Sequence, residues 1–146
     1  MIKETTLHYK TPEEIKAFQE ARLQEALAYL QEHSTFYRRM FQDNNIDISA
    51  IKSIEDLTKI PTTSKQDLQS HNADFLCVSP TDVIDYVTTS GTLGEPVTFA
   101  LTENDLQRLA YNEASSFTMT GCTKEDVMQL MTTIDRRFMA GLAYFL

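Results

Sequence analysis

Apolar residues recur at helical spacing near the start of the chain, and a capping signal precedes them. Thr11 can accept a hydrogen bond at the N-cap, Pro12 suits the first helical position, and Glu14 completes a capping box. Apolar residues then recur every three to five positions, with Glu, Gln, Lys and Arg between them: Ile15, Phe18, Leu23, Leu27 and Leu30. The pattern predicts an amphipathic helix from Pro12 to about His33.

Shorter helices are predicted to follow as far as about residue 76. Ser34 can cap a second helix with an aromatic-rich face, which ends in the turn-prone residues 43–45. Ser53, followed by two acids, can cap a third helix that ends before Pro61. Another helix is predicted to start at Thr63–Ser64. Residues 1–80 are therefore predicted to form a helical N-terminal segment.

The pattern changes from helical to strand-like after residue 80. Residues 83–87 and 97–101 are rich in β-branched and aromatic side chains, and the polar, glycine-containing segment 88–96 separates them. Two strands joined by a polar loop are predicted here.

A helix, a strand and a last helix are predicted after these two strands. Thr102 can cap a helix that runs to about Met119, and Gly121 interrupts it. The short apolar segment 126–131 predicts a buried strand, and Asp135 predicts the N-cap of the last helix. Four methionines are predicted to fill the core: Met119, Met128, Met131 and Met139.

Together these elements predict an α/β fold in two parts. Residues 1–80 form the helical segment, and residues 81–146 begin an α/β domain. The last eight residues, 139–146, are all apolar and lack a capping residue, so we expect the chain to be truncated.

Composition and charge narrow the classes of function. The 146 residues carry a formal charge of −8 without a cluster of Lys and Arg, which argues against nucleic acid as a partner. No apolar segment approaches the roughly 20 residues that span a bilayer, and no signal peptide is visible, so we expect a cytoplasmic protein without a membrane partner. The histidines and the two cysteines are isolated from one another, which predicts no metal site.

The densest chemical signal is the loop between the two predicted strands. Thr88, Thr89 and Ser90 place three hydroxyls beside glycines, and such loops can turn backbone N–H groups toward one anion. The loop is not a Walker A motif, because only two residues separate Gly91 from Gly94 and no Lys-Ser/Thr pair follows. A phosphate-binding loop and an ordinary polar hairpin turn both remain open at this point.

The order of the residues favours the first of these. Thr89-Ser-Gly-Thr-Leu-Gly-Glu-Pro96 resembles the phosphate loop of the adenylate-forming superfamily, with Leu93 where a second threonine is usual. The preceding segments 52–61 and 63–68 and the following Thr102–Asp105 are similar to those of its phenylacetate–CoA ligase branch. The resemblance covers about residues 30–146.

This resemblance implies a function and a set of binding residues. In that branch a carboxylate, such as an aryl acid, reacts with ATP to give an acyl-adenylate and pyrophosphate, and the CoA thiol then displaces AMP. ATP, Mg²⁺ and CoA are the implied cofactors. The implied nucleotide-binding residues are Thr89, Ser90, Gly91, Thr92, Leu93 and Gly94. The catalytic Glu and Lys of the superfamily are expected beyond residue 146, so the isolated chain is expected to be inactive.

Two questions stay open at the level of sequence. The N-terminal helices either contribute to a homodimer, as the resemblance implies, or pack only within their own chain. The chain is either the N-terminal part of a carboxylate–CoA ligase or a helical and α/β assembly module that has lost catalysis.

Overall fold

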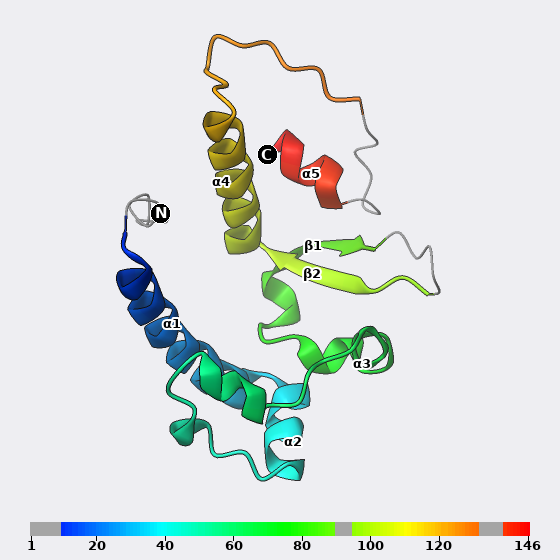
Figure 1. The fold of residues 1–146 in the computed structure, drawn as a ribbon. Helices are drawn as coiled ribbons and strands as arrows, with labels where there is room; N and C mark the ends of the chain where they lie inside the picture. The colour runs from blue at the N-terminus through cyan, green and yellow to red at the C-terminus, as the bar shows by residue number, and fades with distance from the viewer. Residues whose placement is uncertain (1–9, 90–94, 132–138) are drawn as a thin grey trace. The chain divides into compact units, whose positions relative to one another are not determined.

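The computed structural model describes residues 10–89, 95–131 and 139–146 and divides into two compact units. The first unit is Met1–Cys77 and the second is Val78–Leu146. Figure 1 shows the helices of the first unit and the two-stranded sheet and helices of the second. Each unit is described by itself.

The first two helices of the first unit begin as the sequence predicts. Helix α1 is Pro12–His33, and its capping box is confirmed: the Thr11 hydroxyl accepts from the Glu14 N–H at 3.3 Å, and the Glu14 carboxylate accepts from the Thr11 N–H at 2.9 Å. Helix α2 is Thr35–Asp43, and the Ser34 hydroxyl accepts from the Tyr37 N–H at its start. Side chains that accept these N–H groups satisfy donors that a helix leaves unpaired.

Short helices fill the rest of the first unit. They are η2 (Ile48–Ala50), η3 (Glu55–Lys59), α3 (Lys65–Ser70) and η4 (Asn72–Phe75). The cap predicted at Ser53 is wrong in its direction. The Asp56 carboxylate accepts from the Ser53 N–H and hydroxyl, both at 3.0 Å, so the aspartate closes this turn and the serine donates.

Apolar side chains from three segments form the core of the first unit. Leu27, Phe41 and Ile51 are buried together, and six partly buried residues pack on them: Leu23, Leu30, Tyr37, Ile46, Ile48 and Ile60. The Gln24 side-chain amide donates to the carbonyl of Ile51 beside this core. The link joins α1 to the segment after η2, which the spacing of apolar residues does not reveal.

A second contact joins α2 to η4. The rings of Phe36 and Phe75 stack with centroids 4.0 Å apart, and the fully buried Ser34 hydroxyl donates to the carbonyl of Asp74 at 3.1 Å. Stacked aromatic pairs and satisfied buried hydroxyls both favour one fixed arrangement. Ser34 therefore serves as the cap of α2 and also holds η4.

The second unit contains the two predicted strands as one antiparallel pair. After the short η5 (Pro80–Asp82), β1 (Val83–Thr88) pairs with β2 (Thr98–Thr102), and the register runs from Val83↔Thr102 to Thr88↔Thr98. A register irregularity lies between Val83 and Asp85.

Two helices follow this sheet. Helix α4 is Glu103–Met119, begins with a Thr102–Asp105 capping box and contacts β2 and α5 (Met139–Phe145). Gly121 ends α4 at a positive φ of 90°, and the Cys122 N–H donates to the Phe117 carbonyl. This is the Schellman arrangement, in which glycine takes the left-handed conformation at low cost.

The buried strand predicted at 126–131 is wrong. The structure has no strand there, and residues 123–131 are all exposed, with Val127 at 99%. An apolar segment becomes a buried strand only when a partner strand pairs with it and a layer covers it, and no strand of the described part of the second unit pairs with this exposed segment. Core filling by Met119, Met128 and Met131 is wrong for the same reason, since they are 79%, 58% and 84% exposed. The cap predicted at Asp135 and the side chain of Met139 lie outside the described residues.

Candidate functional site

The candidate phosphate loop starts and ends on the β1–β2 pair. After the last pair of the ladder, Thr88↔Thr98, a further pair of hydrogen bonds closes the base of the loop. The Thr89 N–H donates to the Val97 carbonyl at 2.9 Å, and the Val97 N–H donates to the Thr89 hydroxyl oxygen at 3.0 Å. Thr89 and Val97 are therefore fixed to each other, and we call this pair the loop clamp.

Buried apolar side chains support the loop clamp from one side of the sheet. Val87 is 1% exposed, Val97 is 2% exposed and Leu101 is 7% exposed. Alternate residues of a strand point to opposite faces, so Val97 and Leu101 share a face. Neighbouring Thr89 is itself exposed. Thr89 therefore lies next to a packed base and is accessible to solvent or to a ligand.

Thr89 is the one member of the predicted nucleotide-binding set that the structure describes. Ser90, Gly91, Thr92, Leu93 and Gly94 lie outside the described residues. The Thr89 oxygen accepts one hydrogen bond from Val97, and a hydroxyl keeps its own proton to donate elsewhere. Thr89 can therefore position the loop and still offer a donor to an anion.

Charged side chains do not supply the attraction for an anion in this segment. No Lys or Arg occurs between Lys65 and Arg108 in the sequence. Backbone N–H groups and hydroxyls are then the donors that an anion would meet along this loop. Among the described residues, no group of three or more His, Cys, Asp or Glu side chains is placed to hold a metal ion.

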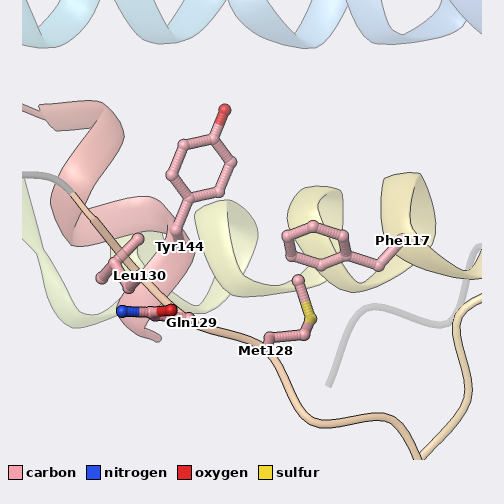
Figure 2. A pocket seen from close by; sticks show the side chains of 5 residues that line it. All are labelled: Phe117, Met128, Gln129, Leu130 and Tyr144. Atoms are coloured by element: carbon pink, nitrogen blue, oxygen red, sulfur yellow. The ribbon is translucent and has the colours of Figure 1, made fainter.

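A pocket of about 410 Å³ lies in the second unit between α4, α5 and the segment 128–130. Figure 2 shows the side chains that line it: Phe117, Met128, Gln129, Leu130 and Tyr144. The rings of Phe117 and Tyr144 lie 6.1 Å apart between centroids. Apolar and aromatic walls of this kind suit an apolar group. The sequence prediction missed this pocket, because it treated Phe117 only as part of a helix and Met128 as core.

A tight turn precedes the pocket residues 128–130. The Asp126 carboxylate accepts from the Thr123 N–H at 2.6 Å and from its hydroxyl at 3.1 Å. These hydrogen bonds, the backbone one first, hold the pKa of Asp126 below its ordinary value. The turn carries a charge next to the apolar lining and is exposed to solvent.

Comparison with known proteins finds relatives among CoA ligases. The chain is 36% identical over 110 residues to a phenylacetate-coenzyme A ligase of Thermus thermophilus, a match that covers 75% of this chain. It is 31% identical over 115 residues, or 78% of this chain, to the enzyme of the same name from Escherichia coli. No protein-family model matches the chain.

Solved structures of 2-hydroxyisobutyryl-CoA ligase share the fold. The structure of its postadenylation state, in complex with 2-HIB-AMP, covers 91% of this chain with a TM-score of 0.79 and 25% identity. The structure of its thioesterification state, in complex with 2-HIB-AMP and CoA, covers 71% with a TM-score of 0.65 and 31% identity. These likenesses confirm the expected fold class.

The match extends over a limited share of each relative. The chain spans about a quarter of the length of the curated relatives, 25% and 26%, and 29% of the postadenylation-state structure. Among the described helices, none combines the length and apolar character needed to cross a membrane.

Proposed function

This chain is a member of the phenylacetate–CoA ligase-like branch of the adenylate-forming enzymes, and we propose that it forms the N-terminal part of an ATP-dependent carboxylate–CoA ligase. The whole enzyme would join a small carboxylic acid, an aryl acid first among candidates, to CoA through an acyl-adenylate in the cytoplasm. Residues 1–80 would be the helical segment and residues 81–146 the start of the α/β adenylation domain.

The loop clamp is the structural observation that carries this proposal. Thr89 and Val97 fix the base of a hairpin, and the sequence that resembles the phosphate loop, 89–96, begins at this base. The sequence supplies hydroxyls and glycines there and no cation. We assign binding of the ATP phosphates to Thr89, Ser90 and Thr92 through hydroxyls, and to Gly91, Leu93 and Gly94 through backbone N–H groups.

These residues would act on the first step of the reaction. When the carboxylate attacks the α-phosphate of ATP, the bond to pyrophosphate breaks and negative charge grows on the leaving group. Donors that already point at that charge stabilise it without having to reorganise. The described residues supply no cluster for Mg²⁺, so the metal would enter with ATP and bind residues outside the described part. The CoA-dependent step would rest on parts of the enzyme beyond residue 146.

An exchange assay on a fusion protein tests this function. This chain is joined to the part of the Thermus thermophilus relative outside the matched region, and ATP–pyrophosphate exchange is measured with a panel of aryl and aliphatic acids. We expect exchange that depends on the acid. The variant S90A/T92A is expected to lower it by about 100-fold or more, the range for removing preorganised donors.

A matched control uses two hydroxyls of the first unit. Thr62 and Ser70 are exposed, and T62A/S70A removes the same number of hydroxyls away from the loop. This control is expected to keep full exchange. Equal rates for S90A/T92A and T62A/S70A would show that the loop is not the phosphate cradle. Absence of exchange with every acid would favour the alternative of a module that has lost catalysis.

A further inference from the structure

Exposed apolar side chains are distributed very unevenly between the two units. The first unit exposes two large apolar side chains among its described residues, Tyr29 at 44% and Leu57 at 42%. The described part of the second unit exposes ten. Helix α4 has 17 residues and none of them is buried. The first unit thus has a closed core, while much apolar surface of the second unit is uncovered.

Two regions of the second unit carry this surface. The first is the segment after α4, where Val127 and Met131 are 99% and 84% exposed. The second is strand β1, where Ile84 and Tyr86 are each 52% exposed. Soluble proteins rarely leave large apolar patches open unless something binds there.

A small molecule is too small to cover these residues. The pocket of about 410 Å³ is lined by Met128 and Leu130, but Val127, Met131, Ile84 and Tyr86 are not part of its lining. An acid bound in the pocket would leave both exposed regions in water. A polypeptide is large enough to cover both regions.

The relatives indicate which polypeptide this is. The chain aligns over 91% of its length with a structure of which it covers 29%. In addition, a two-stranded sheet is marginal on its own, and although α4 contacts β2, Ile84 and Tyr86 of β1 stay exposed. A second copy of the chain is disfavoured, because each copy carries a charge of −8 and two copies would repel.

We propose that the uncovered apolar residues of the second unit, represented by Val127, Met131, Ile84 and Tyr86, are a docking surface for the polypeptide equivalent to the remaining three quarters of the relatives. The surface is then the interior of a larger domain, and the pocket is part of that interior. This proposal rests on the proposed membership of a longer ligase.

Hydrogen exchange on the full 146-residue chain tests the docking. The chain is measured alone and with the separately expressed part of the Thermus thermophilus relative outside the matched region. We expect a stable complex in which the amides of 126–131 and of β1 exchange at least about tenfold more slowly than in the chain alone. Where the two pieces do not associate, the same amides are measured in the fusion protein, which holds both pieces together.

Glutamate substitutions locate the surface. Val127 and Met131 are exposed, so V127E/M131E is expected to leave the fold of the isolated chain unchanged. Two buried charges in the complex are expected to weaken association by at least about 100-fold. The control L57E places a charge on Leu57 of the first unit, which is 42% exposed, and is expected to change affinity by less than about twofold.

Three results would overturn the proposal. One is exchange of residues 126–131 that stays as fast in the complex and in the fusion as in the chain alone. Another is association of V127E/M131E as tight as that of the parent chain. The third is a dimer of the isolated chain that V127E/M131E abolishes, because the occupant would then be a second copy. Slower hydrogen exchange at 126–131 in a fusion protein that shows no ATP–pyrophosphate exchange would refute the proposed function alone. ATP–pyrophosphate exchange in a fusion protein whose residues 126–131 stay unprotected from hydrogen exchange would refute the docking alone.

Discussion

Replacing Ser34 by alanine tests the contact that joins two distant parts of the first unit. The hydroxyl of this fully buried residue accepts from the Tyr37 N–H at 3.3 Å and donates to the Asp74 carbonyl at 3.1 Å. Loss of an N-cap hydroxyl costs about 1 kcal/mol. Removing the donor from a buried carbonyl costs about 1–3 kcal/mol. We therefore expect Ser34→Ala to lower the free energy of unfolding of this unit by about 2–4 kcal/mol.

Ser64→Ala provides the matched control for this prediction. Ser64 caps α3 in the same way, through the Asp67 N–H at 3.2 Å, but it is exposed and its hydroxyl donates only to Asp67. This variant is expected to cost about 1 kcal/mol or less. The free energies of unfolding of both variants are measured by urea unfolding monitored by circular dichroism, together with hydrogen exchange of the α2 amides. If Ser34→Ala costs no more than Ser64→Ala, the bond to Asp74 adds no stability and the reasoning is wrong.

Three further predictions follow from the first unit. Ile51→Ala is expected to cost about 2–5 kcal/mol in urea unfolding, because Ile51 is 2% exposed and its removal leaves a cavity; a smaller loss would mean that the core collapses around it. The hydrogen bond from Lys59, followed by those from the Ser53 and Lys52 N–H groups, lowers the pKa of Asp56 in the folded state. The ionised Asp56 carboxylate therefore stabilises the fold at pH values above its unfolded-state pKa of about 3.9. This stabilisation is lost as the pH falls through the lower pKa of the folded state. The stability difference between the parent chain and Asp56→Asn should accordingly shrink in acid unfolding below about pH 4, and a constant difference would contradict this. Burial raises the pKa of the Cys77 thiol, so less of it is thiolate at pH 8. Iodoacetamide should therefore alkylate Cys77 in the folded chain more slowly than free cysteine, and urea should remove the difference. Peptide mass spectrometry measures the extent of alkylation.

Most features set by neighbours in sequence could be predicted, because the donors and acceptors of a helix cap lie within three or four residues, although the cap predicted at Ser53 was wrong. The boxes at Thr11 and Thr102 are examples. The strands on both sides of the loop were predicted from β-branched residues in the same way. The closure of the loop base by Thr89 and Val97 spans eight residues and was not predicted, since it depends on the register of the sheet.

Features set by distant residues could not be predicted from the pattern. Apolar composition favours burial at 126–131, but it does not say whether a covering layer is present. The Ser34–Asp74 and Gln24–Ile51 hydrogen bonds connect positions 40 and 27 residues apart, and no periodicity marks them. The predicted phosphate-binding role of residues 89–94 stays a prediction, which the exchange assay addresses.

The closed core of the first unit has a consequence for how the protein is made. Its long-range contacts, from α1 to η4, are all completed once the chain has been synthesised as far as Cys77. Domains generally fold as units during synthesis, beginning with the N-terminal one, at about 5–20 residues per second. Adding residues 78–146 takes about 3–14 seconds at that rate, so the first unit can begin to fold before residue 146 is added. The second unit, with its apolar surface uncovered, would then be synthesised after the first unit has begun to fold.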